Sequence, residues 1–221
     1  MSYQIAIDGP AGAGKSTIAK LVAKELNFVY VDTGAMYRAM ALYCVKEGVS
    51  KDDEKAVVKL CRSADVSIRY IDGEQAVFLN GENVNGLIRT PAVSDAASMV
   101  STYKEVREKL VELQRSLTDT ENVVMDGRDI ASVVLPNADL KIYLDADVEV
   151  RAKRRYDELV AKGENPDLDE ILSGVKERDY RDMHRDNSPL TRVPEAVYVD
   201  SSYMSIEEVK NTIIDEFKKV S

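Results

Sequence analysis

Residues 9–16 read Gly-Pro-Ala-Gly-Ala-Gly-Lys-Ser, which fits the phosphate-binding pattern G-x-x-x-x-G-K-S. In such a loop the glycines let backbone N–H groups point at phosphate oxygens, while the lysine reaches the β- and γ-phosphates. The serine oxygen can bind Mg²⁺, and the helix that follows adds the positive end of its dipole. We therefore predict an ATP site with Lys15 as a catalytic group and Ser16 as a metal ligand. The predicted ATP-binding residues are Gly9, Pro10, Ala11, Gly12, Ala13, Gly14, Lys15, Ser16 and Thr17.

Other nucleotide sites fit this chain less well. The spacing of Gly9, Gly12 and Gly14 does not match the dinucleotide pattern G-x-G-x-x-G, which disfavours a hydride-transfer cofactor. The guanine-reading motif N-K-x-D and the switch motif D-x-x-G of GTPases are absent from the sequence. A regulatory module that binds ATP without transferring phosphate remains an alternative, although a second phosphate site would disfavour it.

One candidate for that second site follows the apolar segment 123–125 and reads Asp126-Gly127-Arg128-Asp129. Asp126 stands where P-loop enzymes carry the acid that holds Mg²⁺, and Arg128 could clamp a phosphate with two hydrogen bonds. Gly127 would let the backbone approach a ligand. The alternative is a simple exit from a strand, with a salt bridge at the surface.

A similar arrangement occurs at Val31-Asp32-Thr33-Gly34, where an acid and a tight turn separate a predicted strand from a predicted helix. Arg38 lies one turn into that helix and could reach a phosphate near its start. Thr33 could instead serve only to cap the helix.

Arginine is concentrated late in the chain, because seven of the fourteen arginines fall between positions 151 and 192. Spacings of three and four place six of these arginines on common helical faces in two groups. The groups are Arg151, Arg154 and Arg155, and Arg178, Arg181 and Arg185. The break at 162–166 between the two helices is typical of a hinged lid, which phosphoryl transfer uses to neutralise charge and exclude water. The alternative is a set of solvated ion pairs on exposed helices.

The predicted elements alternate between short apolar strands and amphipathic helices, which indicates a parallel sheet covered by helices on both faces. Ligands of such sheets bind at the carboxyl ends of the strands. The predicted strands are 4–7, 28–31, 122–125, 140–144 and 196–199, each with an aspartate just beyond it: Asp8, Asp32, Asp126, Asp145 and Asp200. The predicted helices are 15–26, 35–47, 52–62, 103–117, 147–161, 168–184 and 206–220.

Residues 66–87 break this alternation. They form short β-rich pieces separated by Asp72-Gly73 and Asn80-Gly81, two strong hairpin-turn signals. We predict a small antiparallel meander inserted into the α/β domain.

Composition narrows the class of protein further. The 221 residues are 44% hydrophobic and 31% charged, as in globular domains, and no apolar run is long enough to span a membrane. The net charge of −9 disfavours nucleic acid polymers and anionic membranes as partners. We expect a cytoplasmic protein in which Cys44 and Cys61 are buried, reduced thiols. The only histidine, His184, is expected to be solvated, so serine triads and histidine metal sites are disfavoured.

Six motifs in order, GPAGAGKS, VDTGAMYR, IRTPAVSDAAS, VVMDGRD, RAKRR and ERDYRD, resemble those of the bacterial cytidylate kinases across essentially the whole chain. The resemblance implies a P-loop nucleoside-monophosphate-kinase fold with a five-stranded parallel sheet, a β insert and a helical lid. It also implies Mg²⁺-dependent phosphorylation of CMP and dCMP by ATP in pyrimidine metabolism, usually by a monomer. One domain, 1–221, would contain a monophosphate-binding region at 35–100, the insert at 66–87 and a lid at 148–188.

The resemblance also implies roles for individual residues. Arg38 and Arg128 would hold the CMP phosphate, and Arg155 and Arg178 would join Lys15 as catalytic groups. The residues implied to bind CMP are Thr33, Arg38, Arg89, Ser98, Arg107, Arg128, Asp129, Arg178, Asp182 and Arg185. Asp126 would join Ser16 at the metal. The resemblance leaves open which lid arginine meets the γ-phosphate.

The implied ligands of the base are chemically suited to cytosine. Asp129 can accept from the N4 amino group, and Arg107 and Ser98 can donate to N3 and O2. Uracil presents O4 in place of the amino group, which would face a carboxylate unfavourably. A kinase for UMP or for a metabolite alcohol is the nearest alternative.

Overall fold

The computed structural model describes residues 2–118 and 121–221. The chain divides into two compact units, which we describe separately. The first comprises Met1–Val29 and Asn122–Ser221, and the second comprises Tyr30–Glu121.

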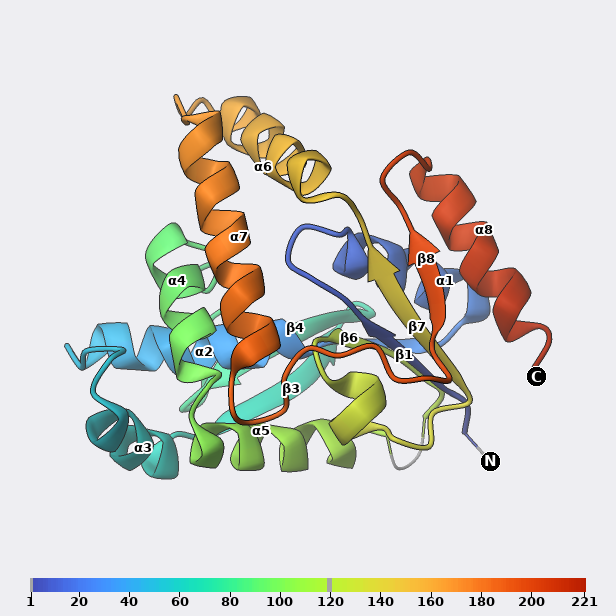
Figure 1. The fold of residues 1–221 in the computed structure, drawn as a ribbon. Coiled ribbons are helices and arrows are strands. Elements are labelled where there is room, and N and C mark those ends of the chain that lie inside the picture. Colours follow the sequence, from blue (N-terminus) through green and yellow to red (C-terminus); the bar gives the residue numbers. More distant parts are fainter. Residues whose placement is uncertain (1, 119–120) are drawn as a thin grey trace. The chain divides into compact units, whose positions relative to one another are not determined.

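A five-stranded sheet carries the phosphate-binding loop (Figure 1). Its strands are β1 (Gln4–Asp8), β2 (Val29–Asp32), β6 (Val123–Gly127), β7 (Leu140–Asp145) and β8 (Val197–Asp200). The strand order is β2-β6-β1-β7-β8, and β1 pairs in parallel with β6 and β7. Residues Ile5, Ala6 and Ile7 of the central strand have no exposed surface. An uninterrupted apolar run suits such a strand because both of its faces are covered.

In the described part of the first unit, three helices pack against strands of this sheet and two others pack against each other. They are α1 (Lys15–Leu26), the short π-helix η1 (Ile130–Val134), α6 (Val148–Ala161), α7 (Leu168–His184) and α8 (Ile206–Phe217). Helix α1 packs against β6 and α8, and Phe217 of α8 meets the rings of Tyr3 and Phe28 edge to face. Helices α6 and α7 pack side by side, joined by residues 162–167 (Figure 1).

The second unit combines helices with a small antiparallel sheet. Its helices are α2 (Thr33–Lys46), α3 (Glu54–Ser63), α4 (Pro91–Val100) and α5 (Lys104–Ser116). Its strands are β3 (Val66–Ile71), β4 (Glu74–Leu79) and β5 (Glu82–Asn83), paired in that order. Helix α2 packs against α4 and β4, and α3 packs against α5.

The two hairpin turns of the small sheet have the backbone conformation that their sequences predict. Asp72 and Gly73 have φ angles of 53° and 79°, and Asn80 and Gly81 have φ angles of 50° and 84°. Two successive residues with positive φ make a type I′ turn, which matches the twist of paired strands. The predicted meander at 66–87 is therefore confirmed.

The predicted fold class is confirmed, and all five predicted core strands are present within two residues of their expected bounds. Helices α1 and α7 begin and end where we predicted. Helix α4 and η1 were not predicted. The signal for α4 was present, since Thr90 caps the helix and Pro91 occupies its first turn. Within the described ranges no helix is long and apolar enough to cross a membrane.

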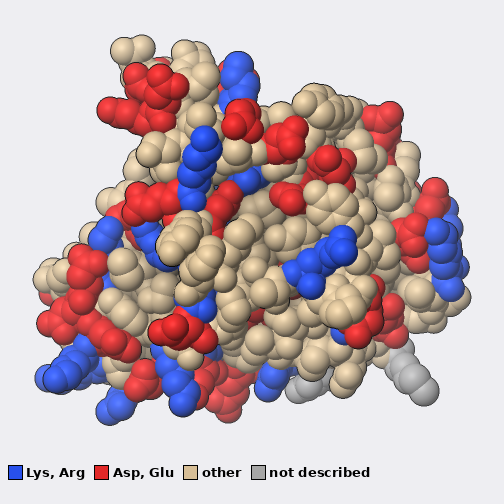
Figure 2. Space-filling view, viewed as in Figure 1, with Lys and Arg blue, Asp and Glu red and all other residues tan. Residues whose placement is uncertain are grey.

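Acidic and basic side chains are interspersed over the face of the molecule drawn in Figure 2. Two arginines of the first unit that stand at predicted site positions, Arg128 and Arg185, are largely hidden instead. The exposed fraction of the side chain is 20% for Arg128 and 3% for Arg185. Positive charge at these positions is thus held inside the unit rather than displayed at its surface.

Candidate active site

The loop at 9–14 requires glycine for both backbone and steric reasons. The φ angles of Gly9, Gly12 and Gly14 are 150°, 80° and 91°, a region that other residues rarely adopt. A Cβ atom on Gly9 would also lie 1.9 Å from the carbonyl oxygen of Leu144. Gly14 is the N-cap of α1 and has no side chain to cap the amides of the first turn. A bound anion could satisfy these amides.

Lys15 is buried at the start of α1, where its Nζ donates a 2.7 Å hydrogen bond to the carbonyl oxygen of Pro10. Burial, assisted by the nearby Arg128 guanidinium, lowers the pKa of Lys15 to about 7. A phosphate bound beside the ammonium would favour its charged form and raise that pKa again.

Ser16 and Asp126 lie together although they are 110 residues apart in the sequence. The Ser16 hydroxyl donates a 2.9 Å hydrogen bond to Asp126 Oδ2. A hydroxyl oxygen and a carboxylate oxygen suit Mg²⁺, which is bound by few protein oxygens together with substrate phosphates and water. The donor set of this pair therefore fits the expected metal.

Asp8, the last residue of β1, anchors the backbone that follows Asp129. Its two carboxylate oxygens accept hydrogen bonds from the amides of Ile130 (2.9 Å) and Ala131 (2.7 Å). Burial raises the pKa of Asp8 to about 7, against the stabilising effect of these amides. Asp8 thus directly precedes the phosphate-binding loop and also holds the backbone just after Arg128 and Asp129.

Arg128 pairs with Asp182 of helix α7, with 2.8 Å between Nε and Oδ2. Burial alone would disfavour both charges, but each stabilises the other. The pKa of Asp182 is held below its ordinary value of 3.8 by Arg128, together with Arg178 and Arg185. The Lys15 ammonium interacts electrostatically with both Arg128 and Asp182. Four predicted site residues and Lys15 thus belong to one charged cluster.

Asp129 and Arg185 are both buried in this part of the unit. Arg185 NH2 lies 3.8 Å from Asp129 Oδ1, and its Nε donates a 2.8 Å hydrogen bond to the carbonyl oxygen of Ser188. The structure therefore brings together those residues of the first unit that were predicted to bind CMP.

The three arginines of α6 differ in environment. Arg151 is buried and bonds to the carbonyl oxygens of Ala11 and Ala146. Arg154 donates a 2.7 Å hydrogen bond to the carbonyl oxygen of Ser201. Arg155 is more exposed and pairs with Glu158 on the same helix, at 2.9 Å. Of the three, Arg155 contributes least to the stability of the folded unit, since exposed ion pairs stabilise a protein little.

In the second unit, two residues predicted to bind CMP, Arg38 and Arg89, both contact Asp32. Its Oδ1 caps α2 by accepting from the amide of Ala35, and its Oδ2 accepts from Arg38 at 2.9 Å and from Arg89 at 3.2 Å. The alternative in which Thr33 caps the helix is therefore wrong. Asp32 is the N-cap, and Thr33 is the buried first residue of α2.

Arg107 and Ser98 are also buried in the second unit. The Arg107 guanidinium lies over the Tyr37 ring, 5.4 Å from its centroid, and NH1 donates to the carbonyl oxygen of Ser101. Ser101 in turn donates to the carbonyl oxygen of Ser98. Helices α4 and α5 thereby hold these two predicted base ligands.

Three residues with a structural part in these sites were not predicted. Gln75 of β4 accepts from the amide of Asp32 at 2.7 Å and donates to its carbonyl oxygen at 3.1 Å. Asp179 pairs with Arg151, and Asp8 holds the start of η1. The position of Asp8 directly before the loop was a usable signal. Nothing in the sequence singles out Gln75, because its partner is 43 residues away.

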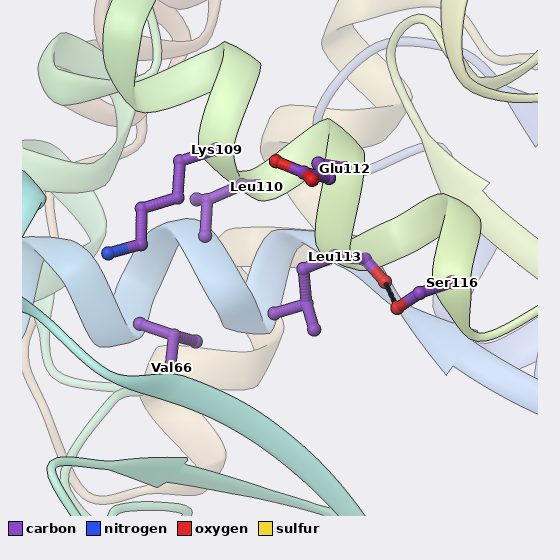
Figure 3. Close-up of a pocket in the computed structure, with 6 residues that line it drawn as sticks. All are labelled: Val66, Lys109, Leu110, Glu112, Leu113 and Ser116. Carbon is purple, nitrogen blue, oxygen red and sulfur yellow. Dashed lines mark hydrogen bonds between the residues drawn. The ribbon is translucent and has the colours of Figure 1, made fainter.

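A groove of about 300 Å³ lies elsewhere, between α5 and Val66 (Figure 3). Its walls are Val66, Lys109, Leu110, Glu112, Leu113 and Ser116. The Lys109 ammonium donates hydrogen bonds to the carbonyl oxygens of Cys61 and Ala64 at the end of α3. No predicted site residue lines this groove.

Cys44, Cys61 and His184 have the environments that we predicted for them. Cys44 and Cys61 are buried free thiols, and burial raises the pKa of Cys44 to about 11. His184 is exposed and stacks on Tyr180 with 4.0 Å between ring centroids.

Comparison with known proteins identifies the family. The family model described as cytidylate kinase matches residues 5–219. A cytidylate kinase of Caldicellulosiruptor bescii is 50% identical over 98% of this chain and 96% of its own length. A cytidylate kinase of Listeria monocytogenes is 49% identical over 95% of this chain and 93% of its own. A solved structure of an uncharacterized protein from Eubacterium ventriosum shares the fold, with a TM-score of 0.56, 12% identity, and 98% and 99% of the two chains covered. The chain belongs to the cytidylate kinase family.

Proposed function

We propose that this enzyme transfers the γ-phosphoryl group of ATP to CMP and dCMP, forming ADP and CDP or dCDP. The observation that carries the proposal is the match to cytidylate kinases over residues 5–219, in a chain whose phosphate loop is intact. The buried cluster around Arg128 supports it, because a second phosphate site beside Lys15 suits an acceptor that is itself a phosphate.

The donor would be held by the loop at 9–17, with Lys15 beside the β- and γ-phosphates. Ser16 and Asp126 would hold Mg²⁺, whose bound charge offsets that of the phosphate oxygens. Lys15 would exchange the carbonyl oxygen of Pro10 for a phosphate oxygen when the nucleotide binds.

The acceptor phosphate would be bound by Arg38, Arg128 and Arg185, and the ribose by Arg178 and Asp182. Thr33 and Arg89 would complete the nucleotide contacts. Asp129, Arg107 and Ser98 would read the base, the carboxylate accepting from N4 of cytosine. A uracil base would leave buried polar groups facing the wrong partners, which is costly and gives selectivity.

The transfer itself needs no general base from the protein. The second pKa of a phosphate monoester is about 6, so the acceptor oxygen is already ionised near neutral pH. Catalysis then consists of aligning the two phosphates and neutralising the charge on the transferring group. Lys15, Arg155 and Arg178 would supply that positive charge, with Arg155 leaving its exposed partner Glu158 to do so.

The test is an acceptor panel in which ADP release is measured with CMP, dCMP, UMP and AMP under identical conditions. We expect CMP and dCMP to be used far better than UMP or AMP. Preferential use of UMP would reject the base assignment, and ATP binding with no acceptor-stimulated ADP release would reject the kinase. The family resemblance also leads us to expect a cytoplasmic monomer, which light scattering and fractionation would test.

A further inference from the structure

Arg151 is the most deeply buried arginine of α6. Its side chain is only 6% exposed, although arginine is among the residues least often buried. Its Nε donates to the carbonyl oxygen of Ala146 at 2.8 Å and its NH1 to that of Ala11 at 3.1 Å. Its NH2 donates to Asp179 Oδ2 at 2.7 Å. One guanidinium therefore joins the end of β7, the phosphate loop and helix α7.

The contact with the loop is steric as well as polar. A Cβ atom on Gly12 would lie 3.2 Å from the Cβ of Arg151, so the arginine stem packs directly against the loop backbone. The planar fork of a guanidinium can bond to several acceptors at once, which a lysine ammonium at the end of a flexible stem does less well. Arg151 is thus built into the wall of the loop.

Asp179, which pairs with Arg151, belongs to helix α7, and this helix also carries residues proposed to bind CMP. Asp179 follows Arg178 directly and precedes Asp182 by three residues, a spacing that places Asp179 and Asp182 on one side of α7. Asp182 is the partner of Arg128. The loop and the residues proposed to bind the acceptor are therefore linked through two ion pairs on a single helix, each with one partly exposed partner.

We propose that Arg151 is a positioning residue that couples the phosphate loop to helix α7, so that donor binding and acceptor binding strengthen each other. The link to the acceptor rests on the proposed function. The link to the donor does not, because it concerns only the loop and Arg151. Movement of Ala11 on nucleotide binding would be transmitted by the guanidinium to Asp179, and from there along α7.

The test uses the variants Arg151→Gln and Asp179→Asn, with Arg151→Lys as the conservative change. Lys153→Gln and Glu177→Gln are matched controls on the same two helices, since both side chains are exposed and neither is in the proposed site. Thermal unfolding of each variant checks that it is folded. Calorimetry then measures ATP affinity without acceptor, and CMP affinity with and without a non-hydrolysable ATP analogue.

In the wild type we expect the analogue to tighten CMP binding by about tenfold, a typical coupling between sites. The ratio of CMP affinity with the analogue to CMP affinity without it should fall toward one in Arg151→Gln and in Asp179→Asn. The double variant should lose no more of this coupling than either single variant. Arg151→Lys should keep part of it, and the controls all of it. Arg151→Gln should also weaken ATP binding without acceptor by about tenfold.

A wild-type ratio of one, or folded variants that keep the wild-type ratio, would overturn the coupling. Unchanged ATP affinity in folded Arg151→Gln would overturn the positioning of the loop. These results differ from failure of the proposed function, which would appear as a wild-type enzyme that binds ATP normally but does not bind CMP.

Discussion

The Nε atom of Arg128 and the Oδ2 atom of Asp182 lie 2.8 Å apart, and this ion pair joins the segment after β6 to helix α7. The Asp182 side chain is 6% exposed and the Arg128 side chain 20%. Neither charge would be stable there alone, because removing one partner of a buried pair leaves the other uncompensated. The pair therefore serves the stability of the unit as well as the charge of the proposed acceptor site.

Asp182→Asn tests the stabilising role through pH. The pKa of Asp182 is lowered in the folded protein, so its contribution is complete above the ordinary value of 3.8 and is lost as the pH falls further. We expect the variant to be less stable by about 3 kcal/mol near pH 7. Urea unfolding from pH 7 to pH 3 should show the two proteins converging only below about pH 4. A gap that is constant over this range would contradict the pairing.

Lys15→Ala tests the donor site. Loss of a buried positive group aimed at the transferring phosphate should lower kcat by about 10²-fold or more, as with other electrostatic donors. Lys24→Ala, on the exposed face of the same helix, is the control and should leave kcat unchanged. Near-normal turnover of Lys15→Ala would remove Lys15 from the mechanism.

Asp129→Ala tests the reading of the base. Because its carboxylate is proposed to contact only the acceptor, the variant should raise KM for CMP by at least about tenfold and leave ATP affinity near that of the wild type. Discrimination between CMP and UMP should shrink at the same time. Steady-state kinetics with each nucleotide varied in turn would measure this, and equal losses for ATP and CMP would reject the assignment.

Asp32 offers a way to separate charge from helix capping. Asparagine is as good an N-cap as aspartate, so Asp32→Asn should keep α2 but release Arg38 and Arg89 from their shared carboxylate. We expect both Asp32→Asn and Asp32→Ala to change KM for CMP and to lose about 3 kcal/mol of stability, because the Asp32 side chain is only 7% exposed and its loss leaves Arg38 without its carboxylate. Asp32→Ala should lose about 1 kcal/mol more, because it also removes the cap. At Asp53, which caps α3 by accepting from Ala56, the alanine variant should cost about 1 kcal/mol of stability and the asparagine variant almost none, and neither should change KM for CMP. A KM change at Asp53 would show that capping, rather than charge, is responsible.

Much of the fold was predictable because local rules determine it. The apolar run at Ile5–Ile7 predicts a strand buried on both faces, and Asp72-Gly73 and Asn80-Gly81 predict tight turns. Helix α4 was missed because its small side chains make a weak periodic pattern, although Thr90 and Pro91 mark its start. The sequence has no comparable signal for η1, whose start is held by the distant Asp8.

The candidate site was predictable in its residue types but not in its pairings. Ser16 and Asp126 were assigned to one metal from their motifs, and they are hydrogen-bonded. The burial of Arg151 could not be predicted, because its spacing on α6 equally suits an exposed lid and its partner Asp179 lies on another helix. Such pairings depend on tertiary packing, which sequence spacing does not encode.

The central claim is that the γ-phosphoryl group of ATP passes directly to the phosphate of CMP. Incubation of the enzyme with CMP and ATP labelled at the γ-phosphate, followed by chromatographic separation of the nucleotides, tests it most directly. We predict that the label appears in CDP in amounts equal to the ADP formed, with no inorganic phosphate released. Label in inorganic phosphate alone, or none in CDP when CMP is present, would contradict it.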